Sequence, residues 1–161
     1  MRILIISDTH RYNSNFDEVL QRIGEPDYLI HCGDISGSEL YFENAVKCPV
    51  VMINGNNDYC SALNDDEEID IEGYHIWITH GHRSRVYYGL EWLYEAAAQR
   101  GADIVMYGHT HVPSIDYDDD LGIYAVNPGS LSYPRQDGRK PSYMIMEIDR
   151  EGEVHFTINY L

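Results

Sequence analysis

The chain has few cysteines and few basic residues. Its 161 residues include 3 cysteines, and only 11 lysines and arginines stand against 27 aspartates and glutamates. Cys32, Cys48 and Cys60 are odd in number, scattered, and without Cys-x-x-Cys spacing, which disfavours a disulfide framework or a structural zinc site. No signal peptide is evident either, so this cysteine usage predicts a reduced, cytoplasmic protein.

Long apolar runs are also missing, and the charge is strongly negative. No run approaches the roughly 18 residues of a membrane span, so we expect no membrane partner. The formal net charge of −16 disfavours long nucleic acid as a partner, because its phosphates would meet a repulsive surface. Small phosphorylated substrates remain open, since bound metal ions set the field inside a site. Length and hydrophobic content predict a single domain over residues 1–161.

Hydrophobic periodicity predicts alternating strands and helices, followed by hairpins. The first half has helices at about 16–23 and 38–46, and strands at 2–6, 28–31 and 50–53. The second half has a helix at 89–100 and strands at 68–71, 75–79, 104–107, 114–117, 123–126, 143–148 and 154–159. Gly24, Gly73, Gly101, Gly122 and Gly152 mark element ends and turns. This order predicts an α/β protein with two sheets packed face to face and helices outside.

Seven side chains of metal-ligating type are spread over most of the chain. They are Asp8, His10, Asp34, Asn56, His80, His109 and His111. Four imidazoles, two carboxylates and one amide suit a pair of divalent transition metals better than calcium or a closed structural zinc. Two such ions about 3.5–4 Å apart can clamp a phosphate and turn a bridging water into hydroxide near neutral pH.

Most of these residues directly follow a predicted strand. Asp8, Asp34, Asn56, His80 and His109 each stand just past a strand's carboxyl end, where loops of α/β sheets converge. His109 and His111 alternate as on a strand, which would turn both rings to one side. Position and chemistry together predict a two-metal hydrolase site.

Five motifs in a fixed order resemble those of the calcineurin-like metallophosphoesterase superfamily, and within it the YfcE-like phosphodiesterase branch. The motifs are Asp8-Thr9-His10, Gly33-Asp34, Gly55-Asn56-Asn57-Asp58, His80-Gly81-His82 and Gly108-His109-Thr110-His111. The resemblance covers the whole chain and includes Asn127-Pro128-Gly129-Ser130. It implies a four-layer α/β/β/α sandwich of two mixed β-sheets flanked by helices.

The resemblance also implies a dinuclear centre and a reaction. Asp34 would bridge two divalent ions, which in this family are commonly manganese, iron, nickel or zinc. One ion would be held by Asp8, His10 and His111, and the other by Asn56, His80 and His109. The implied activity is hydrolysis of small phosphodiesters by a hydroxide held between the metals, with some phosphomonoester activity. A homo-oligomer remains open.

One position departs from the common family pattern. Many members place a histidine directly after the ligand asparagine, where it can protonate the leaving group, but here Asn57 stands there. A missing acid costs about 10²–10⁴ in rate, although members of the YfcE-like branch often lack this histidine too. His82 is the candidate replacement, and Asn57 and Arg135 are candidate phosphate contacts. Because the same fold serves as a non-catalytic subunit in membrane-coat assemblies, a metal-binding interaction subunit is the alternative function.

Several other polar residues have simpler interpretations. We expect His31 to be a hydrogen-bonded core histidine, while Asp58 either orients a ligand or caps the next segment. Arg83 and Arg85 are phosphate contacts or surface ion-pair partners. The acidic run 65–68 reads as a solvated face. The aromatic cluster is assigned to a helix core face or an oligomer interface; it comprises Tyr87, Tyr88, Trp92 and Tyr94.

Overall fold

Two five-stranded sheets form the centre of the molecule. The computed structural model describes residues 1–59 and 61–161, and Cys60 lies outside the described residues. The helices are α1 (Ser14–Ile23), α2 (Glu39–Ala45) and α3 (Glu91–Arg100). The strands are β1 (Arg2–Ile6), β2 (Tyr28–His31), β3 (Val50–Met52), β4 (Asp66–Ile71), β5 (Tyr74–Thr79), β6 (Ile104–Met106), β7 (Ser114–Asp118), β8 (Ile123–Asn127), β9 (Ser142–Ile148) and β10 (Val154–Tyr160).

Both sheets are mixed: the first is antiparallel on its β9 and β10 side only, and the second has a parallel centre with an antiparallel strand at each edge. The first has the order β10-β9-β1-β2-β3, in which β1, β2 and β3 are parallel. The second has the order β4-β5-β6-β8-β7, in which β5, β6 and β8 are parallel. In the first sheet Ile6 pairs with His31, and His31 with Met52. The parallel strands therefore end level, and the loops that follow them start at one edge.

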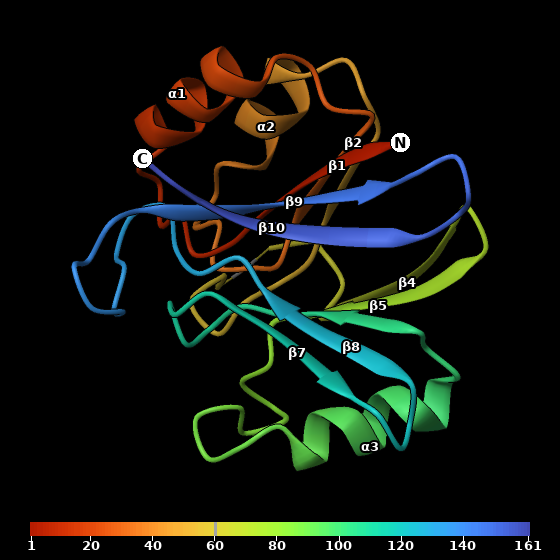
Figure 1. Cartoon of the computed structure of the whole chain (residues 1–161). Helices are drawn as coiled ribbons and strands as arrows, with labels where there is room; N and C mark the ends of the chain where they lie inside the picture. The colour runs from red at the N-terminus through yellow and green to blue at the C-terminus, as the bar shows by residue number, and fades with distance from the viewer. Residues whose placement is uncertain (60) are drawn as a thin grey trace.

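The side-chain alternation of β1 shows how the layers are built. Ile3 and Ile5 point into the core between the two sheets, whereas Leu4 and Ile6 point to the other face. There they pack beneath α1 and α2, which lie side by side over this sheet (Figure 1). The successive apolar residues thus serve two cores, as expected of a strand buried on both faces.

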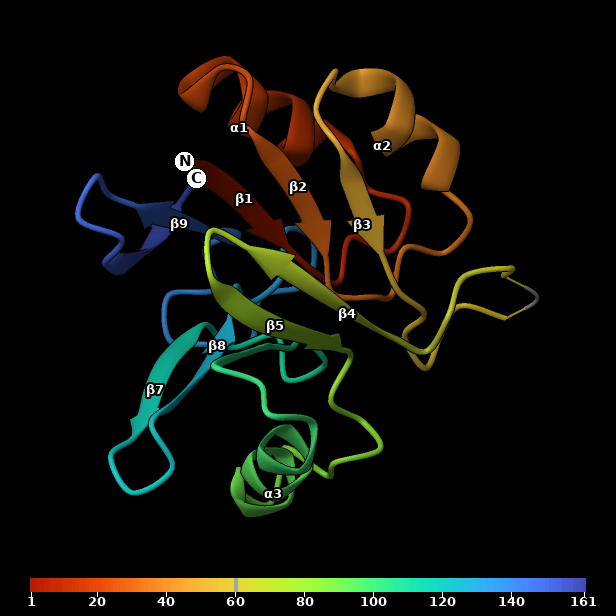
Figure 2. The same cartoon turned by 90° about the vertical axis from the view of Figure 1, so that its right-hand side faces the viewer.

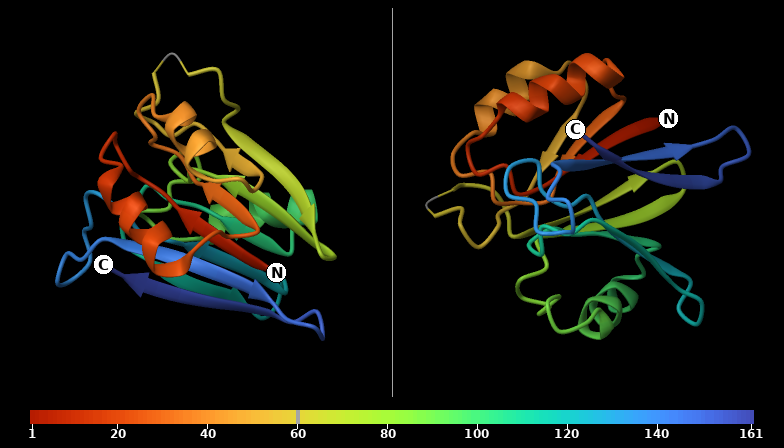
Figure 3. Two further views of the ribbon diagram at one scale, coloured as in Figure 1. Left: turned by 90° about the horizontal axis from the view of Figure 1, so that it is seen from above. Right: turned by 60° about the vertical axis from the view of Figure 1, so that its left-hand side comes forward.

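The second sheet is covered by α3 on its outer face (Figure 2). Leu93 and Ala97 of the helix pack with Trp77, Val105 and Ala125 of the strands. The layers are therefore α1 and α2, the first sheet, the second sheet and α3, and the views in Figure 3 show the same stack. The predicted four-layer α/β/β/α fold is confirmed.

Some element boundaries differ from the prediction. β4 begins at Asp66, because the acidic run that the sequence assigned to a solvated face is partly paired. Trp77 Nε1 donates to Asp66 Oδ2 at 2.9 Å, and Arg100 lies 3.3 Å from Glu68. The interpretation as a solvated face holds for Asp65 and Glu68, which are exposed, whereas Asp66 and Glu67 are half-buried. None of the three helices in the described ranges has the length and apolar character needed to cross a membrane.

Candidate metal centre

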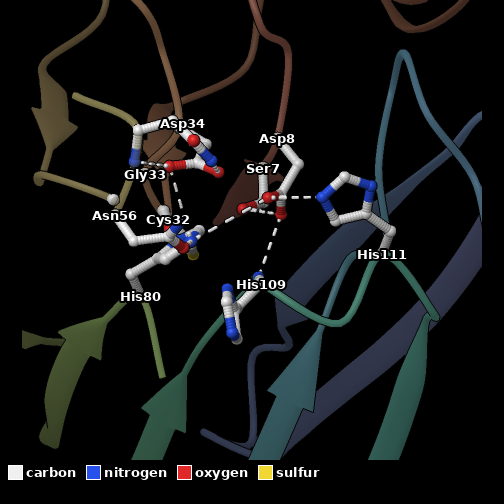
Figure 4. Close-up of polar contacts among 12 residues, drawn as sticks. Ser7, Asp8, Cys32, Gly33, Asp34, Asn56, His80, His109 and His111 are labelled. Carbon is white, nitrogen blue, oxygen red and sulfur yellow. Dashed lines mark hydrogen bonds and ion pairs between the residues drawn. The ribbon is translucent and has the colours of Figure 1, made fainter. Parts of the chain in front are cut away.

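The loops after β1, β2, β5 and β6 meet between the two sheets, together with the segment after β3 (Figure 4). Each of the five strands delivers one predicted ligand just past its end. These residues are Asp8, Asp34, Asn56, His80 and His109. His10 follows on the loop after β1, and His111 on the loop after β6. Residues up to 103 positions apart in sequence are thereby brought to one place.

Asp8 is the most deeply buried carboxylate of the cluster, with no exposed surface. Its Oδ2 accepts hydrogen bonds from Ser7 Oγ at 2.6 Å and from the backbone N–H of His109 at 3.1 Å. Among residues 1–59 and 61–161, its Oδ1 has no hydrogen-bond donor in acceptable geometry. Three imidazole nitrogens surround this oxygen, at 3.0 Å from His111, 3.9 Å from His10 and 4.0 Å from His80. A buried, unpartnered carboxylate oxygen among imidazoles fits a bound cation.

Asp34 lies between two of these imidazoles. Its Oδ2 is 3.7 Å from His10 Nε2 and its Oδ1 is 3.6 Å from His80 Nε2. Both oxygens also accept hydrogen bonds from Asn57, from the backbone N–H at 2.8 Å and from Nδ2 at 2.6 Å. Burial opposes the charged carboxylate, but the hydrogen bond and charge of His80 and the two hydrogen bonds from Asn57 outweigh it and lower the pKa of Asp34. Asp34 is therefore ionised at neutral pH.

Four of the seven predicted ligands form one tight group. Asp8, His10, Asp34 and His111 can each offer one ligand atom such that all four atoms lie within 4.8 Å of one another. His111 is oriented by Nδ1, which donates to the carbonyl of Tyr133 at 2.6 Å and leaves Nε2 facing Asp8. Fixing one ring nitrogen in this way selects the tautomer that a metal ligand needs.

His80 faces the other oxygen of Asp34, and Asn56 and the ring of His109 lie beside His80. His80 Nδ1 donates to the carbonyl of Cys32 at 2.7 Å, so Nε2 faces Asn56 Oδ1 at 3.1 Å. Burial disfavours the charged ring, but the hydrogen bond that the ring donates to Asp34 and the charges of Asp8 and Asp34 raise the pKa of His80 to about 8. The ring of His109 lies 5.1 Å from that of His80. Burial and the neighbouring His80 lower the pKa of His109 to about 4, which favours the neutral form that binds metals.

The backbone at this site is strained. The φ angles of Asp8, His10, Asp34, His109 and His111 are 53°, 45°, 58°, 69° and 60°. Residues other than glycine seldom adopt such left-handed values, and strained residues cluster at functional sites. The strand-like alternation expected of His109 and His111 is therefore wrong, because both lie in a loop and in the left-handed region.

The glycines of two motifs are required by close packing. A Cβ at Gly55 would lie 2.1 Å from Asp34 Oδ1, and a Cβ at Gly33 would lie 2.8 Å from His80 Nδ1. Gly33 also has a φ of 97°, which side chains disfavour. These glycines let the loops after β2 and β3 approach each other until Asp34 and His80 meet.

Asp58 joins the same two loops, which settles an alternative that the sequence left open. Its carboxylate accepts hydrogen bonds from the backbone N–H groups of Ile35 at 3.2 Å, Ser36 at 2.6 Å and Gly55 at 2.8 Å. Asp58 thus positions the segments that carry Asp34 and Asn56, rather than capping the segment after it.

His31 is a buried, hydrogen-bonded core histidine, as predicted. Its Nδ1 accepts from the backbone N–H of Gly33 at 3.2 Å, and its Nε2 lies 3.0 Å from Thr9 Oγ1. Burial lowers the pKa of His31 to about 4, so the ring is neutral. It ties the loop after β1 to the loop after β2.

Tyr87 approaches the centre, which sequence reasoning missed. Its hydroxyl donates to the carbonyl of His109 at 2.9 Å and accepts from Arg135, and its ring lies 4.8 Å from the His109 ring. Tyr87 is 52% exposed and Tyr88 87% exposed, so the assignment to a helix core face is wrong for both. No pattern in the sequence distinguishes Tyr87 from its neighbours, because its role depends on a loop conformation.

The remaining candidates have distinct surroundings. The His82 ring is 5.5 Å from that of His80 and 6.0 Å from that of His109. Its Nδ1 is buried without a hydrogen-bond partner among the described residues. Arg83 pairs with Asp65 at 2.8 Å, and the guanidinium of Arg85 lies 4.7 Å from the Trp92 ring. The surface ion pair is thus the better interpretation of Arg83.

Comparisons with known proteins agree with this geometry. A family model described as the calcineurin-like phosphoesterase superfamily domain matches residues 1–151. The chain belongs to this superfamily. The probable metallophosphoesterase YsnB of Bacillus subtilis is 32% identical over 152 residues, which cover 94% of this chain and 86% of that protein. The phosphodiesterase MJ0936 of Methanocaldococcus jannaschii is 30% identical over 148 residues, which cover 80% of this chain and 83% of that protein.

Two solved structures with a similar fold align with nearly the whole chain. The Vps29 protein of Entamoeba histolytica, complexed with zinc, aligns with a TM-score of 0.77 at 26% identity and covers 99% of both chains. YfcE, a phosphoesterase from E. coli, aligns with a TM-score of 0.69 at 20% identity and covers 98% of both. The second likeness concerns the fold alone. The resemblance to the superfamily and to YfcE is confirmed, and membership implies use of a divalent metal ion.

Proposed function

We propose that this chain is a dinuclear metal-dependent phosphodiesterase that hydrolyses small phosphodiesters. The observation that carries the proposal is the buried Asp8 Oδ1, which has no hydrogen-bond donor in the part of the chain that the structure describes and faces three imidazoles. Asp34 lies between His10 and His80, as a bridging ligand requires. The similarity to a protein named phosphodiesterase over four-fifths of the chain supports the choice of diesters.

The residues divide into two ligand groups around Asp34. One ion would be held by Asp8, His10 and His111, and the second by Asn56, His80 and His109, with Asp34 shared. When bound, two such ions neutralise charge on the phosphate oxygens and supply an activated water. Manganese is the metal we propose. Iron, nickel and zinc are alternatives, because imidazole and carboxylate ligands suit all four metals.

The protein orients the ligand side chains, and His82 is its candidate general acid. The carbonyls of Cys32 and Tyr133 fix the rings of His80 and His111, and Asn57 fixes the carboxylate of Asp34. Burial, His80 and Arg83 together lower the pKa of His82, so the ring is mostly neutral near pH 7 and only a small fraction of molecules has a proton there to donate. The proposed enzyme therefore favours substrates whose leaving groups depart without strong acid assistance.

A metal-removal experiment tests the proposal. Turnover of bis(p-nitrophenyl) phosphate should cease after exhaustive chelation and return with manganese, and elemental analysis should find two ions per chain. Asp34→Asn should abolish turnover and lower the metal content, since the shared carboxylate is weakened. Asp119→Asn, an exposed change, serves as the control. Full turnover by metal-free protein would end the proposal.

The competing function is a metal-binding interaction subunit. The observation that favours this alternative is the likeness to Vps29. The same experiment separates the two. A chain that binds two ions but turns over no diester, and that retains a stable partner from its native cell, would support the interaction subunit.

A further inference from the structure

A cavity of about 750 Å³ opens beside the metal centre. His10 and Asn57 form the wall that it shares with the centre, and it extends over Ser36 and Gly37 toward the start of α2. Pockets for small organic ligands have volumes of roughly 300–1,000 Å³. The cavity therefore has room for a sizeable substituent attached to a phosphate at the centre.

Arg11 lines this cavity directly after His10. Its Nε donates to the carbonyl of Ser36, and a Cβ at Gly37 would lie 3.3 Å from its Nη2. The guanidinium is thus held across Gly37. Within residues 1–59 and 61–161, no carboxylate lies within ion-pair distance of Arg11 and its Nη groups donate no hydrogen bond. Donors of a fixed cation therefore remain for a ligand.

The other arginines near the motifs are engaged elsewhere. Arg83 pairs with Asp65, Arg85 stacks on Trp92, and Arg135 donates to the Tyr87 hydroxyl. Arg11 was not singled out by its sequence position, because only the fold places it over Gly37. It is the arginine that faces the cavity between the loop after β1 and α2.

Acidic and apolar groups share the cavity with Arg11. Glu39 contributes a carboxylate that lies 3.4 Å from Ser61 Oγ, and Leu63 and Tyr59 contribute apolar surface. A second phosphate would be repelled by Glu39. A nucleobase instead offers hydrogen-bond acceptors to arginine, donors to a carboxylate, and a planar apolar face.

We propose that this cavity binds a nucleoside, as the substituent that stays on phosphorus when the diester is cleaved, and that Arg11 determines this specificity. The inference rests on the proposed phosphodiesterase function and narrows its substrate class to nucleotide diesters. Arg11 contacts the nucleoside through its Nη donors, while the metal-ligating residues position the phosphate.

The experiment compares two diesters with the same leaving group, thymidine 5′-(p-nitrophenyl phosphate) and methyl p-nitrophenyl phosphate. The manganese-loaded chain should prefer the thymidine diester in kcat/KM. Arg11→Ala should lower this preference by about tenfold or more, mainly through KM, because a charged hydrogen bond is lost. Arg11→Lys should retain part of the preference for the thymidine diester. Arg83→Ala is the matched control and should keep the wild-type preference.

Binding supplies a second readout that does not depend on turnover. By calorimetry, thymidine 5′-monophosphate should bind the manganese-loaded chain more tightly than methyl phosphate, and Arg11→Ala should reduce that difference. If neither diester is hydrolysed, the phosphodiesterase function fails while an Arg11-dependent difference still supports the nucleoside site. A preference or binding difference that is unchanged in Arg11→Ala would overturn the nucleoside site alone.

Discussion

Asp34 owes its orientation to Asn57, the residue directly after the predicted ligand Asn56. Asn57 donates to both oxygens of the Asp34 carboxylate, and only the bond from Nδ2 depends on its side chain. The amide of Asn57 therefore positions the Asp34 carboxylate. Partners of metal-ligating carboxylates matter nearly as much as the ligands.

Removal of the Asn57 amide should weaken metal binding. In Asn57→Ala we expect manganese affinity to fall about 10–100-fold, as for other partners of ligating groups, with the fold intact. Manganese titration followed by calorimetry measures the change. Asn44→Ala, which removes an exposed amide bonded to its own helix, is the control. Equal affinity in both variants would contradict the positioning role.

His31 should make stability of the metal-free protein depend on pH. Its pKa is about 4 in the folded chain, below the roughly 6.5 of an unfolded histidine. The unfolded state therefore binds the extra proton, and the contribution of His31 is present above pH 6.5 and is lost as the pH falls toward 4. Urea unfolding measures the free energy of unfolding at pH 7.5 and pH 5. It should fall less between these pH values in His31→Gln than in the wild-type chain. An equal fall in the wild-type chain and in His31→Gln would contradict this role of His31.

At the scale of elements, α1 and α2 are joined to the first sheet through aromatic packing. Phe16 of α1 is fully buried, and its ring lies 4.9 Å from the ring of Phe42 in α2. Because α1 follows the loop that carries Asp8 and His10, its packing also fixes the end of that loop. Burial of one helix face thus supports the position of two candidate ligands.

Truncation of this contact should destabilise the fold. We expect Phe16→Ala to lower the free energy of unfolding by about 3–5 kcal/mol, as core phenylalanine deletions do. Leu40→Ala on α2 is the control, because Leu40 is 72% exposed and should change stability by about 0.5 kcal/mol or less. Denaturant unfolding followed by circular dichroism measures both. Similar values for the two variants would show that the α1 contact contributes little.

The whole molecule carries a formal net charge of −16. Such a charge destabilises the compact state through self-repulsion, which dissolved salt screens. The candidate centre concentrates two buried carboxylates within the same acidic chain, so bound cations and screening both favour the folded state.

Stability should therefore rise with ionic strength. We expect the Tm of the metal-free chain to increase between about 0.05 and 1 M sodium chloride, because repulsion among acidic groups is screened. A variant that neutralises two exposed acids, Asp119→Asn with Asp120→Asn, should show a smaller increase. Calorimetric melting measures both. A Tm that is flat or falls with salt would contradict the repulsion argument.

The sequence by itself determined most elements and the family. Short apolar runs bounded by turn residues predicted the strands, because apolar patterning and turn chemistry are local properties. Gly24 and Gly101 marked helix ends for the same local reason. The ligand types past successive strands predicted a metal centre, since the carboxyl ends of parallel strands share one edge of a sheet.

Only the tertiary structure decided which distant groups meet. The bond from Asn57 to Asp34, the contact of Tyr87 with His109 and the placement of Arg11 over Gly37 all depend on loop conformations. No periodic pattern encodes such conformations. They depend on left-handed backbone and on close approach between loops, which the packing of the two sheets imposes.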